Sequence, residues 1–136
     1  MNAYTFNQLP YLLRLRQVLA CGFKAHTVLD LVREGTLHPV RTGRHNYYRR
    51  AEIGPLIGVP IDWAEFDKLP ELLRRGHLIG LGIESRCIER LRLDGCLGVL
   101  NDHAPRKRFY KFDAAELVGR GAESRGSRVE SKKERK

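Results

Sequence analysis

Two short segments of the sequence stand out chemically, because each combines closely spaced cations with aromatic rings. The first is RTGRHNYY at residues 41–48, and the second is RKRFYK at residues 106–111. Residues 36–51 contain four arginines and no acid, although the chain holds sixteen acidic side chains. This composition is typical of surfaces that contact phosphate. The predicted contact residues are Arg41, Thr42, Arg44, His45 and Asn46 in the first segment and His103, Arg106, Lys107 and Arg108 in the second.

Each basic segment follows a short helix that begins after one glycine and ends at another. Gly22 and Gly35 bound the first helix, and Gly82 and Gly95 bound the second. Apolar side chains recur at helical spacing on one side, which leaves the polar side chains to point outward. The predicted outward-facing contacts are Lys24, Ala25, His26, Thr27 and Arg33 in the first helix and Ser85, Arg86, Glu89 and Arg90 in the second. Because the two sets differ, the helices are expected to read different sequences.

These paired features belong to a repeat with a period of sixty residues. Ten of the 32 positions in residues 6–37 are identical to their counterparts in 66–97, and a two-residue insertion further on pairs Tyr47-Tyr48 with Phe109-Tyr110. A long period that occurs only twice indicates duplicated small domains. The predicted organisation is a first unit over 1–58, a linker over 59–66, a second unit over 67–119 and a disordered basic tail over 120–136.

Each unit is predicted to be mainly helical with a small β-hairpin, an α+β class. A supporting helix is expected over residues 6–19, capped by Asn7, and its counterpart over 70–81. The second helix of each unit is expected over 25–34 and 85–94, followed by hairpins and then by short helices over 51–58 and 113–118. The single Trp63 is placed either between the units or in the second core. Each unit is therefore interpreted as a helix-turn-helix with a wing.

The order of these motifs resembles the excisionase-like and MerR-like winged helix-turn-helix superfamily. The resemblance rests on Gly22-Phe23 in the turn, Thr27-Val28 in the second helix, REGTL at 33–37 and the basic segment at 41–48. The second unit repeats the pattern at 82–83, 87–88, 93–97 and 106–110, so the resemblance covers about residues 6–119. Lys24 and Glu84 depart from it, since they stand where the family often has Ser or Thr.

The resemblance implies sequence-specific binding of double-stranded DNA. The second helices would enter the major groove, and the wings would lie on the backbone or in the minor groove. The family implies a transcriptional regulator or an accessory factor of recombination, plasmid maintenance or conjugative transfer. The duplication is expected to act as an internal dimer, so that a monomer occupies two adjacent half-sites. The alternative is a winged-helix scaffold that binds proteins in a nucleoprotein complex; RNA binding is a weaker third option.

The bulk composition agrees with a polyanionic partner. The net charge is +9, from 25 Lys and Arg against 16 Asp and Glu. The sequence shows neither a membrane span nor a secretory signal, and its three cysteines lack CxxC spacing, so a reducing cytoplasmic setting is expected. The cysteines are interpreted as core or loop thiols rather than metal ligands. Neither a cofactor site nor a catalytic set is recognised, and we expect no enzyme activity.

Overall fold

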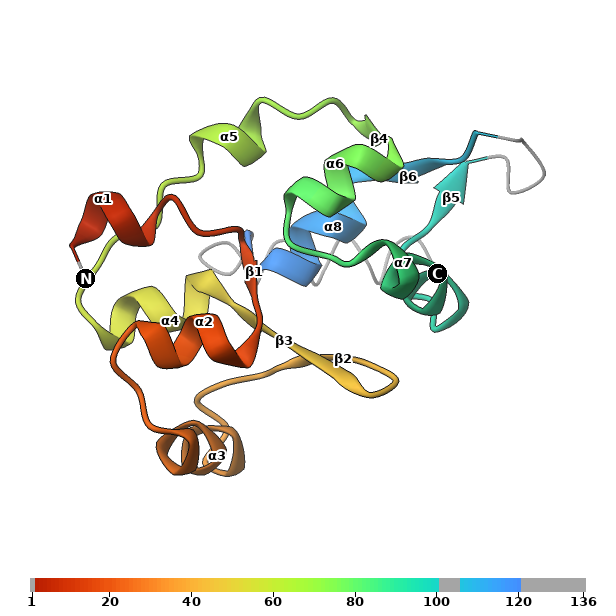
Figure 1. Cartoon of the computed structure of the whole chain (residues 1–136). Coiled ribbons are helices and arrows are strands. Elements are labelled where there is room, and N and C mark those ends of the chain that lie inside the picture. Colours follow the sequence, from red (N-terminus) through yellow and green to blue (C-terminus); the bar gives the residue numbers. More distant parts are fainter. Residues whose placement is uncertain (1, 101–105, 121–136) are drawn as a thin grey trace.

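The computed structural model describes residues 2–100 and 106–120, which form two units with the same order of elements (Figure 1). The first unit contains α1 (Ala3–Phe6), β1 (Leu12–Leu13), α2 (Leu15–Ala20), α3 (Ala25–Arg33), β2 (Val40–Thr42), β3 (His45–Arg49) and α4 (Arg50–Leu56). The second contains α5 (Ala64–Asp67), β4 (Leu72–Leu73), α6 (Arg75–Gly80), α7 (Ser85–Leu93), β5 (Val99–Leu100), β6 (Arg108–Tyr110) and α8 (Lys111–Val118). The predicted combination of helices with small antiparallel sheets is confirmed at this level.

Each unit has one three-stranded antiparallel sheet, in the orders β1-β3-β2 and β4-β6-β5. Leu13 pairs with Tyr48 in the first sheet, and Leu73 pairs with Phe109 in the second. Phe109 is therefore the counterpart of Tyr48, an offset of 109 − 48 = 61 residues. The predicted pairing of Tyr47 with Phe109 was wrong by one residue.

The predicted continuous helix over 6–19 was also wrong, because Leu12 and Leu13 form a strand instead. Both side chains are fully buried, but Leu13 packs in the first core and Leu12 in the core of the second unit. Successive side chains of a strand point to opposite faces, whereas a helix would place these neighbours on roughly the same side. The same departure occurs at β4, so α6 begins only at Arg75.

Asn7 caps the end of a helix rather than the start of one. It follows α1, and its side-chain amide donates to the carbonyls of Ala3 at 3.0 Å and Pro60 at 3.1 Å. Its side-chain oxygen accepts a hydrogen bond from the Asp62 amide at 2.9 Å. Asn7 therefore fastens the start of the chain to the connection between the units.

The predicted second helices and first hairpin closely match α3, α7 and the β2–β3 pair. The last helix differs, because α8 begins at Lys111 rather than at Asp113. The Asp113 carboxylate accepts a hydrogen bond from the Gly98 amide at 2.7 Å, so it braces the segment before β5 and does not cap α8.

The two units share part of their hydrophobic core. The first core is centred on residues such as Phe6 and Tyr48, which belong to the first unit alone. The second core also takes in side chains of the first unit, namely Tyr11, Leu12, Val40 and Tyr47. Burial of apolar surface thus holds the units together.

The range 121–136, where a disordered tail is predicted, lies outside the described residues.

Trp63 lies at this junction and also packs against the second core, so both predicted placements describe it. Its ring stacks on Tyr11 of the first unit, with centroids 5.2 Å apart and planes 2° apart, and it meets Phe66 edge-on at 6.2 Å. Arg120 covers the ring at 5.2 Å. Val59 packs in the first core and Phe66 in the second, so the connecting segment is anchored at both ends.

Gly82 sits where the backbones of the two units come into contact. The amide of Leu12 donates to the carbonyl of Leu81 at 2.9 Å. Gly82 has φ +112°, and a Cβ added there would lie 2.2 Å from the carbonyl oxygen of Leu12. Gly22, its counterpart in the repeat, has φ +109° and no heavy atom within 4 Å of the corresponding position. Glycine is therefore required at 82 for space as well as for backbone conformation.

None of the helices in the described ranges is both long and apolar enough to cross a membrane.

Candidate nucleic-acid interface

The start of α3 presents the predicted contact residues to solvent. Lys24 precedes the helix as its N-cap residue, and Lys24, Ala25 and His26 are exposed. Thr27 is half-buried, and the next side chain, Val28, is buried in the core. The first turn of α3 is thus an accessible surface of mixed polarity.

Arg33, at the far end of α3, is also exposed. Its guanidinium lies 3.9 Å from the Asp30 carboxylate, a loose pair one turn away. Surface pairs of this kind contribute about 0–1 kcal/mol, so Arg33 can exchange this partner for a phosphate at little cost.

The predicted arginines of α7 are exposed and engaged in ion pairs. Arg86 donates to the Glu84 carboxylate at 2.7 Å, and Arg90 donates to Asp94 at 3.2 Å. Both arginines are well over half exposed, at 69% and 58%. Salt screens such pairs, and either guanidinium can turn toward an incoming anion.

The other two predicted residues of α7 are held by arginines. Glu89 accepts hydrogen bonds from Arg92 Nε at 3.1 Å, and these hydrogen bonds lower the pKa of the Glu89 carboxyl. Ser85 binds Arg75 of α6 through both its hydroxyl and its carbonyl, at 2.7 Å each. Arg75 therefore ties the two helices of the second helix pair together.

The first wing is the β2–β3 hairpin, and its outer residues are available for contacts. Arg41 and Asn46 are exposed and lie opposite each other in the ladder, and Arg44 is exposed at the turn. All three side chains are therefore accessible to a partner.

Thr42 does not fit the predicted role of a wing contact. It is only 3% exposed, and its hydroxyl donates to the carbonyl of His45 at 3.2 Å. The same hydroxyl lies 3.4 Å from the sulfur of Cys87 at the start of α7. The hairpin packs against the second unit here, which buries Thr42 and leaves His45 half-buried.

One group of side chains joins the first wing to α7. The Arg14 guanidinium forms an ion pair with Glu84 and lies 3.4 Å from Nδ1 of His45. The hydroxyl of Tyr47 accepts a hydrogen bond from the Glu84 amide at 3.0 Å. We call Arg14, His45 and Tyr47 the first-unit corner; it is occupied by the start of α7.

The electrostatics of this corner follow from its geometry. Hydrogen bonds from Arg86 and then from Arg14 hold the pKa of Glu84 below its usual range. Burial, reinforced by a hydrogen bond with Cys87, raises the pKa of Tyr47 to about 12. Glu84 is thus an anion and Tyr47 a neutral phenol at physiological pH.

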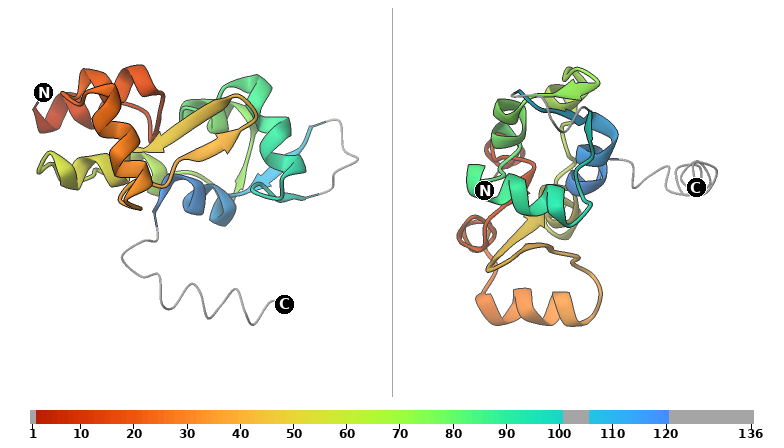
Figure 2. Two further views of the ribbon diagram at one scale, coloured as in Figure 1. Left: turned by 90° about the horizontal axis from the view of Figure 1, so that it is seen from below. Right: turned by 90° about the vertical axis from the view of Figure 1, so that its right-hand side faces the viewer.

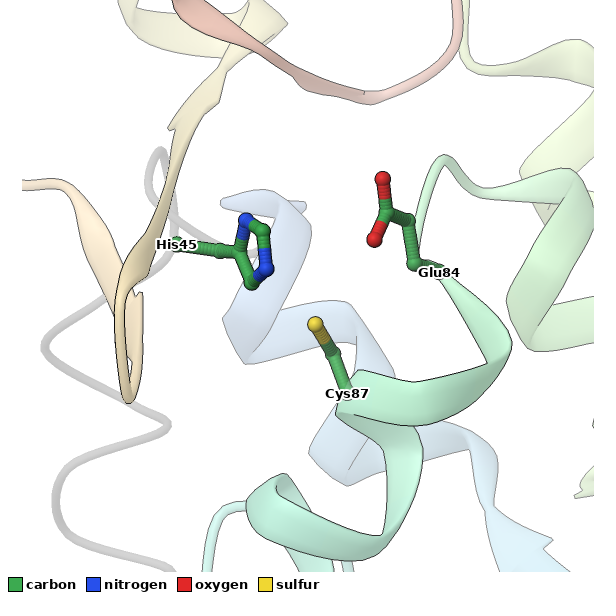
Figure 3. A group of neighbouring side chains, drawn as sticks. All are labelled: His45, Glu84 and Cys87. Atoms are coloured by element: carbon green, nitrogen blue, oxygen red, sulfur yellow. The ribbon is translucent and has the colours of Figure 1, made fainter.

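The same place contains donor atoms that a metal could use. Figure 3 shows His45 on the hairpin turned toward Glu84 and Cys87 at the start of α7, and their ligand atoms lie within 4.8 Å of one another. Imidazole, carboxylate and thiolate are ligands that zinc accepts. However, one carboxylate oxygen is bound by Arg14 and the other by Arg86. A metal ion would have to displace two guanidiniums from Glu84, so the arrangement disfavours a cation at this place.

The second wing, β5–β6, borders a cavity of about 350 Å³ between α6, α7 and β6. Arg106 is exposed at its rim, and Lys107 and Arg108 are half-buried. The predicted contact His103 lies outside the described residues. Five cationic side chains line the cavity: Arg74, Arg75, Arg106, Lys107 and Arg108.

Not every arginine of the basic segment 36–51 faces outward. Arg50 is 2% exposed and donates to the carbonyls of Asn7 at 3.1 Å and Asp62 at 3.0 Å. Its guanidinium also lies 4.2 Å from the ring centre of Tyr11, and burial lowers its pKa. Lys111 makes the equivalent contacts in the second unit, so these two cations brace the units internally.

Sequence reasoning missed several members of this interface. Arg14 and Arg74 are identical positions of the repeat and are followed by α2 and α6, a signal that could have pointed to them. Nothing in the local sequence pairs Glu84 with Arg14, seventy residues away.

Comparison of the chain with family models, with curated proteins and with solved structures finds no match.

Proposed function

We propose that the chain is a tandem winged helix-turn-helix protein that binds double-stranded DNA. The observation that carries the proposal is the duplicated arrangement of α3 and α7. Both helices are seen nearly end-on in Figure 1 and side-on in the right view of Figure 2, so their axes run in similar directions. Each exposes polar side chains at its first turn. Two such helices in one chain suit two major-groove half-sites.

The hairpin β2–β3 lies between α3 and α7 in both views (Figures 1 and 2). Because it packs on α7, it acts first as a spacer that sets the position of one helix relative to the other. Arg41 and Arg44 on its exposed side would contact the DNA backbone, while Arg106 would do so from the second wing. The cations supply affinity, and the helices supply sequence choice.

The test is selection of bound duplexes from a random DNA pool at near-physiological salt, followed by measurement of affinity against salt. The expected product is an asymmetric site with two unlike halves about one helical turn apart, since the exposed faces of α3 and α7 differ. Binding should weaken with salt by about 0.9 log units per phosphate contact for each tenfold rise in concentration. Recovery of no preferred sequence would contradict sequence-specific binding.

Arg86→Ala tests base readout by α7, with Arg33→Ala as a matched exposed arginine on α3. If Arg86 reads guanine, its removal should cost about 1–3 kcal/mol on the selected site and far less on random DNA. Equal losses on both DNAs would show that Arg86 contacts phosphate only. Whether the complex regulates transcription or assists recombination, plasmid maintenance or conjugative transfer follows from where the selected site occurs.

A protein-binding scaffold is the second candidate, and exposed leucines favour it. Leu29 on α3 is 54% exposed and Leu93 on α7 is 67% exposed, whereas a helix in a groove presents mostly polar side chains. Charge reversal at Arg44 and Arg106 distinguishes the candidates. Loss of DNA binding on charge reversal supports a DNA function for the wings. Affinity for a protein partner that charge reversal leaves unchanged supports the scaffold.

A further inference from the structure

The cavity beside the second wing has an excess of positive charge. Five cations line it, and the one lining carboxylate, Glu89, is already hydrogen-bonded to Arg92. Arg108 donates to the carbonyls of Arg106 and Lys107 at 3.4 Å each, and Arg75 donates to Ser85. Among residues 2–100 and 106–120, Arg74, Arg106 and Lys107 form no ion pair, although Lys107 helps to lower the pKa of Glu89. Like charges held close together repel, so a cluster of this composition is stabilised by a bound anion.

The repeat allows this cluster to be compared with its counterpart in the first unit. Strand pairing makes Phe109 the equivalent of Tyr48. Continuing this offset of 61 residues back along the chain aligns Arg108 with Tyr47 and Arg106, which lies just before β6, with His45. Arg74 matches Arg14 directly in the sequence repeat. We call Arg74, Arg106 and Arg108 the second-unit corner.

The first-unit corner is occupied by an anion from the chain itself. Arg14 pairs with the Glu84 carboxylate, and Tyr47 accepts a hydrogen bond from the Glu84 amide at 3.0 Å. In the second unit the corresponding space is the cavity of about 350 Å³. One carboxylate therefore fills the first corner, and the second corner is a larger, more basic version of the same site.

The substitutions between the two corners change the anion that fits. His45 and Tyr47, which suit a single carboxylate and an amide, are replaced by arginines at 106 and 108. Leu15, exposed at the start of α2, is replaced by Arg75. Several arginines converging on one space suit a group with several charged oxygens, because a guanidinium binds two oxygens at once.

A second copy of the chain does not complete the second-unit corner. The counterpart of Glu84 in the repeat is Lys24, which is exposed and positively charged. If another copy docked through α3 as α7 docks on the first unit, Lys24 would face Arg74. That contact places like charges together and blocks a head-to-tail array.

We propose that the second-unit corner is a receptor for a phosphoryl group, and that Glu84 closes the first-unit corner to the same ligand. The phosphoryl group would come either from the DNA backbone or from a soluble phosphorylated molecule. Only the first of these sources rests on the proposed function. The two units then contact phosphate unequally, and the second unit anchors the chain.

The receptor is tested without DNA by titrating the full chain with sodium pyrophosphate, against sodium chloride at equal ionic strength, followed by NMR. Saturable shifts are expected at Arg74, Arg106 and Phe109, and none at Arg14. The double change Arg74→Gln and Arg106→Gln should weaken pyrophosphate binding at least tenfold. Arg16→Gln, a matched exposed arginine of α2 outside both corners, should leave it unchanged. Shifts that do not saturate, or that are as large at Arg16, overturn the proposal.

The closed corner has its own test in the same titration. Glu84→Gln keeps the shape of the side chain and removes its charge, so Arg14 should begin to respond to pyrophosphate. A silent Arg14 in this variant, with its unfolding transition unchanged from that of the wild-type chain, overturns the claim that the Glu84 charge closes the first corner.

The source of the phosphoryl group is resolved with duplexes in which single backbone phosphates are replaced by methylphosphonate. If DNA supplies the group, one neutral position should weaken binding of the wild-type chain but not of Arg106→Gln. Pyrophosphate binding with no such position assigns the receptor to a soluble phosphorylated molecule. If the chain binds no DNA, the proposed function fails, and the pyrophosphate titration still decides the receptor.

Discussion

Replacement of Gly82 by alanine measures how much the contact between the units stabilises the protein, and the repeat supplies its control. Gly82 and Gly22 have nearly equal φ angles, +112° and +109°. A Cβ at 82 would lie 2.2 Å from the Leu12 carbonyl oxygen, whereas a Cβ at 22 would meet nothing within 4 Å. The two substitutions therefore share the backbone strain and differ in the clash between units.

The magnitudes follow from these distances. Backbone strain at positive φ costs about 1–2 kcal/mol for either alanine. At Gly82 the units must also move apart, which adds about 1–3 kcal/mol of overpacking. Separation weakens the hydrogen bond from Leu12 to Leu81, worth about 1 kcal/mol. We expect Gly82→Ala to lower the free energy of unfolding by about 2–4 kcal/mol more than Gly22→Ala.

Urea unfolding, followed by the fluorescence of Trp63 and by far-UV circular dichroism, measures both variants. Trp63 stacks on Tyr11 across the junction, so its fluorescence reports separation of the units. In Gly82→Ala the fluorescence change should precede the loss of helix, while in Gly22→Ala the two should coincide. Equal destabilisation by the two alanines would mean that the clash between the units contributes no free energy.

Three further predictions concern the contacts that hold the units in place. The pKa of Glu84 is lowered in the folded chain, so its ion pairs stabilise fully above the ordinary glutamate value of about 4.3 and are lost as pH falls through the lowered value. Unfolding free energies measured from pH 6 to pH 3 should therefore fall less steeply in Glu84→Gln; an unchanged slope would contradict this role. Tyr47→Phe removes the acceptor of the Glu84 amide and should cost about 1–3 kcal/mol in urea unfolding, and a neutral result would mean that water replaces the hydroxyl. Arg50→Met should destabilise the chain far more than Arg50→Lys, because a lysine, Lys111, donates to the equivalent carbonyls in the second unit. Thermal unfolding of the two variants makes the comparison, and equal losses of stability would argue against the equivalence of Arg50 and Lys111.

The parts of the fold that the sequence predicted well are those set by local patterns. The apolar spacing within α3 and α7 and the glycines at their ends specify those helices without help from the rest of the chain. The β2–β3 hairpin follows equally from a tight turn at Gly43, whose φ is +61°. Such signals act over a few residues, so the local structure that they specify does not depend on the surrounding packing.

The errors arose where burial depends on a distant partner. Leu9, Leu12 and Leu13 look like one helical stripe, but Leu12 is buried by the second unit and Leu13 by the first. A pattern of apolar residues cannot tell one buried face from two. The one-residue error at Tyr47 has the same origin, because both tyrosines are buried and strand pairing alone decides which belongs to the first core.

The candidate interface divides in the same way. The exposed residues at the starts of α3 and α7 were predicted from helical periodicity, but the burial of Thr42 and the convergence of Arg74 and Arg106 on one cavity were not. Their positions depend on how the hairpins pack, which is a property of the assembled chain.

The duplication, the helices that bear the exposed polar residues and the excess of positive charge can be read from the sequence alone, since each is a count or a short-range pattern. The contrast between the two corners arises only in the folded chain. Glu84 and Arg14 are seventy residues apart and meet because apolar burial brings the start of α7 onto the first wing. That packing fills one corner with a carboxylate and leaves its counterpart basic, a difference that only the joined units could create.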